Sequence, residues 1–229
     1  MDARIFAENI LNSKDAETLV AKLPLGKKTD GETYFSHRVQ KAERYHHTCV
    51  TGKERTCFIE GLICALSTIY AGRGAAFVVL SPNPVYTRLL RLKNADVTVP
   101  YIRSEKDLSS VLSAVFPLIE RARKKATPKL FLVLDGLEEL GSKELSRTLK
   151  AYLPFFEKTV LAPVEIITGV NMENSIFSGD PSVFVGAGNT LVSVDELTYA
   201  DATYIDETGN TCLPERIDYP LVTEKGKRC

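Results

Sequence analysis

The chain has 229 residues, and its 29 Lys and Arg are balanced by 29 Asp and Glu, so the formal net charge is zero. That balance removes the strongest compositional argument for nucleic-acid binding but leaves room for a local basic patch. Hydrophobic residues make up 44% and charged residues 25%, which is typical of a globular protein and argues against a disordered chain.

The first 30 residues predict a helical N-terminal extension. Apolar side chains recur with loose helical spacing over residues 4–23. Pro24, Gly26 and the turn residues Thr29, Asp30 and Gly31 follow, and we interpret them as breakers that end the helix.

From residue 31 onward, apolar strands alternate with amphipathic helices. We expect strands at 34–40, 47–51, 75–80, 96–102, 129–134 and 164–168, and helices at 56–70, 83–92, 104–125 and 142–156. This alternation predicts an α/β fold with a parallel central sheet and helices on both faces, over a core of residues 31–182.

From residue 183 the pattern changes to short strands and turns, with strands expected at 183–186, 190–194, 202–205 and 211–213. Residues 183–229 are therefore predicted to form a small β-rich C-terminal appendage and tail.

Cysteine usage and hydropathy bear on the cellular compartment. Five cysteines without a CxxC spacing favour reduced thiols over a disulfide framework or a zinc site. The N-terminus lacks the apolar core of a signal peptide, and no apolar run approaches the roughly 18–20 residues that span a bilayer. We expect a cytoplasmic chain without membrane insertion, held at a membrane only by a partner or a parent polypeptide.

Ligands of parallel sheets bind at the carboxyl ends of the strands, so the residues after each predicted strand are the first to inspect. Gly52, Lys53, Arg55 and Thr56 follow a strand and open a helix, which is the layout of a phosphate-binding loop. The full pattern is G-x-x-x-x-G-K-[ST], and this loop is three residues shorter, with Arg55 in place of Lys. The alternative is an ordinary tight turn between a strand and a helix.

The strand at 129–134 ends in Asp135, where an acid after apolar residues is typical of a magnesium site. Thr56 and Asp135 are thus the candidate Mg²⁺ ligands. Gly136 stands where a Glu would activate water, which leaves Asp135 and Glu138 as candidates for a catalytic role, with Glu139 beside them. The alternative is that Asp135 and Gly136 simply begin a turn.

In this order of elements the chain resembles the motor domains of the FtsK/SpoIIIE family, over roughly residues 23–190. The residues that carry the resemblance are the Leu-Pro-Leu-Gly segment at 23–26, His47 before the loop, the helix start at 55–63, the Ser-Pro-Asn at 81–83 with Tyr86 downstream, and the acidic-then-basic cluster at 120–123. The later ATPase modules of the type VII secretion proteins EssC and EccC are similar.

The resemblance implies a RecA-like P-loop NTPase fold with ATP and Mg²⁺ as cofactors. It places the strands at 47–51 and 130–134 next to each other. It implies homologous ATPase modules or other proteins as partners, with DNA as a further alternative. Such folds complete their site with a neighbour's arginine, a role that Arg121 or Arg123 could fill in trans.

Departures from the family pattern favour a degenerate member. The loop is short, Ser81-Pro82-Asn83 replaces Asp-Pro-Lys, no Glu follows Asp135, and no Gln lies within 168–171. Each such group contributes about 100-fold or more to phosphoryl transfer by positioning and electrostatics. We therefore predict a pseudo-ATPase that acts through protein contacts in a motor or secretion assembly. The alternative is a weakly active, ATP-driven DNA or protein translocase subunit.

Overall fold

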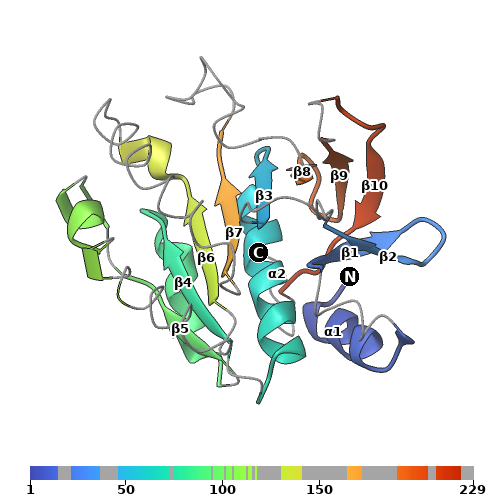
Figure 1. Ribbon diagram of the computed structural model, residues 1–229, viewed down its shortest axis with the longest axis horizontal. Coiled ribbons are helices and arrows are strands. Elements are labelled where there is room, and N and C mark those ends of the chain that lie inside the picture. The colour runs from blue at the N-terminus through green and yellow to red at the C-terminus, as the bar shows by residue number, and fades with distance from the viewer. Residues whose placement is uncertain are drawn as a thin grey trace.

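The fold is described by a computed structural model of the chain (Figure 1). It describes residues 1–14, 22–36, 46–72, 75–93, 95–100, 102–104, 106–111, 113–114, 117, 130–140, 164–171, 190–205 and 210–222. The helices are α1 (Ala3–Leu11) and α2 (Arg55–Ile69), with the 3₁₀ helices η2 (Pro84–Arg91) and η3 (Leu137–Leu140). The strands are β1 (Pro24–Lys28), β2 (Thr33–Phe35), β3 (His46–Thr51), β4 (Ala76–Leu80), β5 (Asp96–Thr98), β6 (Leu130–Asp135), β7 (Val164–Gly169), β8 (Thr190–Ser193), β9 (Tyr199–Tyr204) and β10 (Glu215–Asp218).

The described strands form one ten-stranded sheet in the order β2-β1-β10-β9-β8-β3-β7-β6-β4-β5. The pairs from β8 to β5 are all parallel, and those from β8 to β2 are all antiparallel. All six residues of β6 are buried, as expected of a strand that is covered on both faces. The predicted α/β fold with a parallel central sheet is confirmed.

The lateral order of two strands differs from our prediction. We expected the strands at 47–51 and 130–134 to be neighbours, but β7 lies between β3 and β6 and pairs in parallel with both. The family resemblance therefore gave the wrong neighbours, and the apolar runs could not correct it because they identify buried strands without encoding which strand pairs with which.

Strand β1 was not predicted, because we interpreted Pro24 and Gly26 as residues that end a helix. Pro24 is the first residue of the strand, a position where the missing N–H is tolerated. A Cβ on Gly26 would lie 2.8 Å from the carbonyl oxygen of Asp218, so glycine permits the close pairing of β1 with β10. Through this pairing, the N-terminal and C-terminal segments join the same sheet.

Other boundaries shift by a few residues. The predicted helix at 83–92 is the 3₁₀ helix η2, and the strand expected over 96–102 covers only 96–98. Residues 211–213 contain a single bridge from Thr211 to Ile205, while the unexpected β10 begins at Glu215. The strand predicted at 183–186 and the helix at 142–156 lie outside the described residues, as does much of the helix at 104–125.

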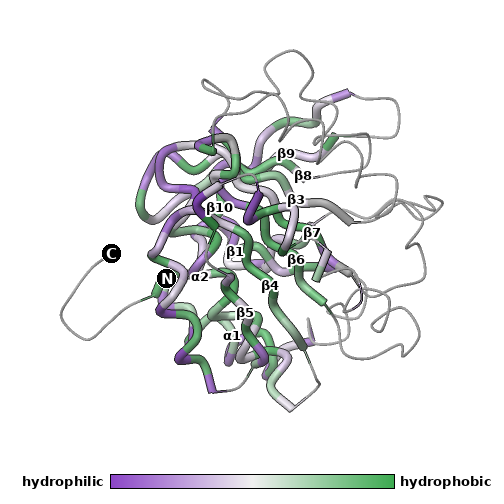
Figure 2. Tube along the Cα trace, turned by 90° about the vertical axis from the view of Figure 1, so that its left-hand side faces the viewer, coloured by the Kyte–Doolittle hydropathy of each residue, from purple (hydrophilic) through white to green (hydrophobic). Residues whose placement is uncertain are grey.

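Helix α2 is buried along most of its length and packs beside the sheet (Figure 1). A Cβ on Gly61 would lie 1.8 Å from the carbonyl oxygen of Pro220, so the helix backbone meets the C-terminal segment directly. Hydrophobic residues are concentrated along the inner strands and α2 (Figure 2). No helix in the described part of the chain has the length and apolar character needed to cross a membrane.

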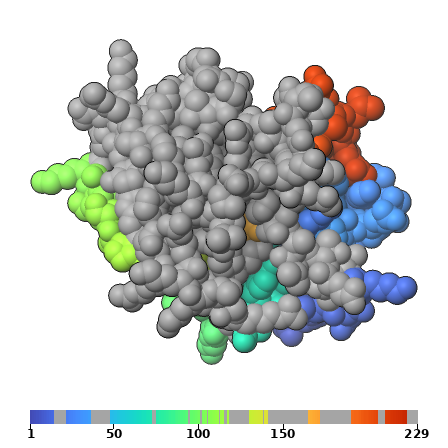
Figure 3. Space-filling view, in the orientation of Figure 1, coloured from blue at the N-terminus to red at the C-terminus, as the bar shows by residue number. Residues whose placement is uncertain are grey.

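The two ends of the sheet lie on opposite sides of the molecule. In the space-filling view, the described residues from both chain termini gather on one side, and the segment that follows β4 lies on the other (Figure 3). The candidate site residues meet at the carboxyl end of β6, where the start of α2 contacts Asp135.

Candidate functional site

The loop between β3 and α2 is a tight turn whose backbone is bonded to neighbouring carbonyl groups. The N–H of Arg55 donates to the carbonyl oxygen of Gly52 at 3.3 Å, and the N–H of Glu54 donates to that of Val194 at 3.0 Å. Gly52 has a φ of +97°, and a Cβ there would lie 2.4 Å from the oxygen of Val194. Only glycine fits this position, because both the dihedral and the contact exclude a side chain.

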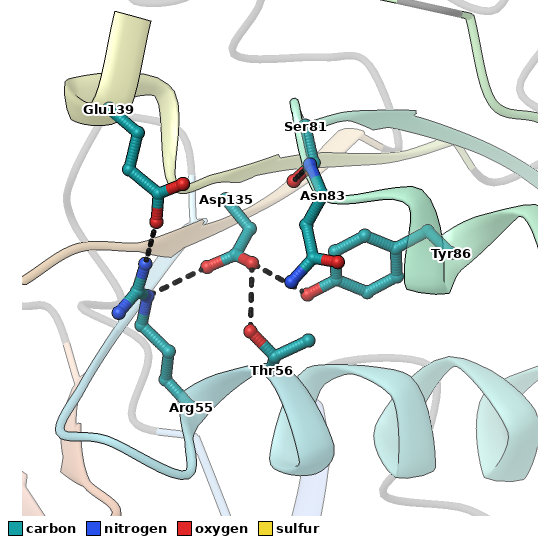
Figure 4. A network of polar contacts seen from close by, with 7 residues as sticks. All are labelled: Arg55, Thr56, Ser81, Asn83, Tyr86, Asp135 and Glu139. Carbon is teal, nitrogen blue, oxygen red and sulfur yellow. Dashed lines mark hydrogen bonds and ion pairs between the residues drawn. The ribbon is translucent and has the colours of Figure 1, made fainter. Parts of the chain in front are cut away.

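The carboxylate of Asp135 is the centre of a buried polar network at the end of β6 (Figure 4). Asp135 is only 1% exposed to solvent. Oδ1 accepts from Nε of Arg55 at 3.0 Å, and Oδ2 accepts from Oγ1 of Thr56 at 3.2 Å and from the hydroxyl of Tyr86 at 2.9 Å. Three donors from two different elements therefore converge on one acid.

The fold brings these donors to the end of β6 from two elements, α2 and η2. Arg55 and Thr56 are the first two residues of α2, and Tyr86 lies in η2, which follows β4. The side-chain Oδ1 of Asn83 accepts from the N–H of Val85 at 3.0 Å and so caps the start of η2. Ser81 Oγ accepts from the N–H of Asn83 at 3.1 Å (Figure 4).

Two glycines shape the surroundings of Asp135: Gly169 makes room for its carboxylate, and Gly136 turns the chain after it. A Cβ on Gly169 of β7 would lie 2.0 Å from Oδ1 of Asp135, so the acid occupies space that any other residue would fill. Gly136 has a φ of +66°, and its N–H donates to the carbonyl oxygen of Gly169 at 3.1 Å. The chain therefore turns sharply directly after the acid.

The charged side chains of the network differ in their exposure to solvent: Asp135 and Arg55 are largely buried, and Glu139 is exposed. Arg55 is 11% exposed and also contacts Oε1 of Glu139 at 3.2 Å, where the Glu139 side chain is 61% exposed. Burial raises the pKa of Asp135, and the Arg55 charge and the hydrogen bonds oppose that shift. Burial and the neighbouring Asp135 charge raise the pKa of Tyr86 well above its usual value, so its hydroxyl stays a hydrogen-bond donor.

The predicted site residues are brought together only in part. Arg55, Thr56 and Asp135 share the network, and Gly52 forms the turn, but Lys53 is exposed. The side chain of Glu138 and all of Arg121 and Arg123 lie outside the described residues. No group of three or more His, Cys, Asp or Glu that could hold a metal occurs in the described part of the chain.

Three contributors to the site had no strong local signal in the sequence. Tyr86 appeared only as part of a family resemblance, and nothing nearby indicated that its hydroxyl would reach Asp135. Gly169 and Val194 act through a close approach and a backbone carbonyl, respectively. Such roles depend on pairing between distant strands and leave no residue-type signature.

A mostly parallel sheet, a strand–glycine–helix turn and a buried acid at the end of a nearby strand together form an α/β fold with polar groups where such sheets bind ligands. Several solved structures share this fold. The cytoplasmic domain of the Thermomonospora curvata type VII secretion ATPase EccC is 12% identical, with a TM-score of 0.61 over 90% of this chain and 30% of that chain. The cytoplasmic domain of EssC is 10% identical, with a TM-score of 0.61 over 97% of this chain and 46% of that one.

EssC (ATPases 2 and 3) from Geobacillus thermodenitrificans is 10% identical, with a TM-score of 0.58 over 92% of this chain and 44% of that chain. This chain therefore spans less than half the length of each of these proteins. At such identities the similarity establishes the fold alone, and the predicted α/β fold class is confirmed. The sequence matches no family model and no curated protein.

Proposed function

We propose that this chain is a non-hydrolysing, ATPase-like module of a secretion assembly, which acts through contacts with other proteins or with homologous ATPase modules. Its fold is that of ATPase modules in type VII secretion proteins, some of which carry more than one such module in a chain. Two of the similar structures, those of EccC and EssC, are cytoplasmic domains, which supports a cytoplasmic location for this chain as well.

The observation that carries the proposal is the closed backbone of the loop at 52–56. A working phosphate loop presents its N–H groups to the nucleotide. Here the N–H groups of Glu54 and Arg55 donate to the carbonyl oxygens of Val194 and Gly52. A phosphate would have to displace two internal acceptors before it could bind to these donors.

The side chains do not fit a magnesium-bound nucleotide in this arrangement. Thr56 and Asp135, the two candidate Mg²⁺ ligands, are hydrogen-bonded to each other, and the Arg55 guanidinium pairs with Asp135. Glu139, one of the two glutamates that follow the position of the missing general base at Gly136, is engaged with Arg55. We therefore derive no hydrolytic step at this site.

We expect weak nucleotide binding. In a titration of the purified chain with magnesium–ATP by calorimetry, the dissociation constant should be weaker than about 100 μM, which corresponds to a binding free energy weaker than about −5.5 kcal/mol. A low-micromolar value would show that the loop can open to take phosphate and would contradict the proposal.

We also expect turnover far below about 1 s⁻¹, a modest enzyme rate, in steady-state ATPase assays of the chain alone. Asp135→Ala is the control for contaminating activity, because a genuine site should depend on this acid. A rate of about 1 s⁻¹ that falls in this variant would favour the weakly active translocase. Mixing the chain with an active homologous module would then show whether it alters that module's rate.

A further inference from the structure

The Asp135 carboxylate is buried, so its negative charge must be stabilised by nearby positive charge or hydrogen-bond donors. It is 1% exposed, and a buried charge that loses its partner is strongly destabilising. Within the described part of the chain, the side chains that donate to it are the guanidinium of Arg55 and the hydroxyls of Thr56 and Tyr86. Of these, Arg55 alone carries a positive charge.

The guanidinium of Arg55 also bridges two acids. It contacts Oδ1 of Asp135 at 3.0 Å and Oε1 of Glu139 at 3.2 Å. On the other side of the same carboxylate, the Thr56 hydroxyl is 3.2 Å from Oδ2. The Arg55 guanidinium therefore lies between two carboxylates, one buried and one exposed, next to a hydroxyl group (Figure 4).

Carboxylate and hydroxyl oxygens are ligands for hard divalent cations, and Mg²⁺ is commonly held by one or two carboxylates while it keeps several waters. We infer that Arg55 is a built-in substitute for a divalent cation, and that it keeps closed a latent cation site formed by Asp135, Glu139 and Thr56. This inference rests on the proposed function, since it explains how the module is stabilised without a metal–nucleotide ligand.

The test measures thermal unfolding of the full chain with MgCl₂, and with NaCl at matched ionic strength, in the absence of nucleotide. The wild-type chain should show no Mg²⁺-specific change. Arg55→Ala should melt at a lower temperature, and Mg²⁺ should restore part of the loss. At about ten times the dissociation constant, its folding equilibrium constant should rise about tenfold.

Two further variants test whether the Mg²⁺ response arises at the site formed by Asp135, Glu139 and Thr56. Arg55→Lys keeps a positive charge and should show no Mg²⁺ response. Arg55→Ala combined with Asp135→Asn removes the buried carboxylate and should also lose the response. Calorimetric titration of Arg55→Ala with MgCl₂ alone should give binding that is absent in the double variant.

The inference is overturned if Arg55→Ala responds to Mg²⁺ no more than the wild type does, or if the double variant responds equally. If Arg55→Ala does not fold, refolding yields with and without Mg²⁺ decide the matter. Rescue by Mg²⁺ supports the inference, and failure in both conditions while Arg55→Lys folds rejects it. Tight binding of magnesium–ATP by the wild type is a separate result that would count against the proposed function instead.

Discussion

Gly61→Ala is expected to lower the free energy of unfolding by about 3 kcal/mol, near the upper end of the range for overpacking. The added Cβ would lie 1.8 Å from the carbonyl oxygen of Pro220 and 3.1 Å from Cα of Leu221. These are backbone atoms, so no side chain can rotate away, and α2 must separate from the C-terminal segment. The higher helix propensity of alanine relative to glycine offsets only about 1 kcal/mol of this loss. Urea denaturation monitored by circular dichroism measures the change.

Thr68→Ala is a suitable control because it lies in the same helix and is only partly buried. Its hydroxyl bonds the carbonyl oxygen of Cys64 within the helix, so we expect a change within about 0.5 kcal/mol. If Gly61→Ala were as mild as this control, the close contact between α2 and Pro220 would be wrong.

The C-terminal segment is also hydrogen-bonded to the start of α1, so we expect Gly61→Ala to affect that helix as well. The N–H of Ala3 donates to the carbonyl oxygen of Leu221 at 2.9 Å, and the N–H of Leu221 donates to that of Met1 at 2.7 Å. Displacing residues 220–221 should therefore loosen the N-terminal helix too. Hydrogen exchange at the amides of α1 in Gly61→Ala would detect this coupling.

Asp135→Ala is expected to cost about 3–5 kcal/mol, the usual effect of removing one partner from a buried ion pair. Arg55 is only 11% exposed and would lose its buried carboxylate, and the fully buried Tyr86 would lose the acceptor of its hydroxyl. Chemical denaturation of the purified variant gives the magnitude.

Glu139→Ala is the matched control, since it removes the other acid that contacts the same guanidinium. Its side chain is 61% exposed, so solvent screening limits the expected loss to less than about 1 kcal/mol. Equal losses in the two variants would mean that Asp135 is not the centre of the network.

Local pattern was sufficient to identify the α/β class and to single out three residues that the fold brings together, namely Arg55, Thr56 and Asp135. The apolar runs at β4 and β6 and the helical periodicity of α2 are visible in the sequence, because burial on both faces or on one face fixes the residue types along an element. The same logic placed Arg55, Thr56 and Asp135 at strand ends, where parallel sheets bind ligands.

Tertiary structure alone decided how these pieces meet. The strand β7 separates β3 from β6, β1 pairs with β10, and the loop's N–H at Glu54 bonds a carbonyl at Val194 from far along the chain. Side-chain periodicity records whether a residue is buried, but not which backbone it is buried against. The pairing of Arg55 with Asp135 therefore became apparent only when α2 and β6 were placed at one edge of the sheet.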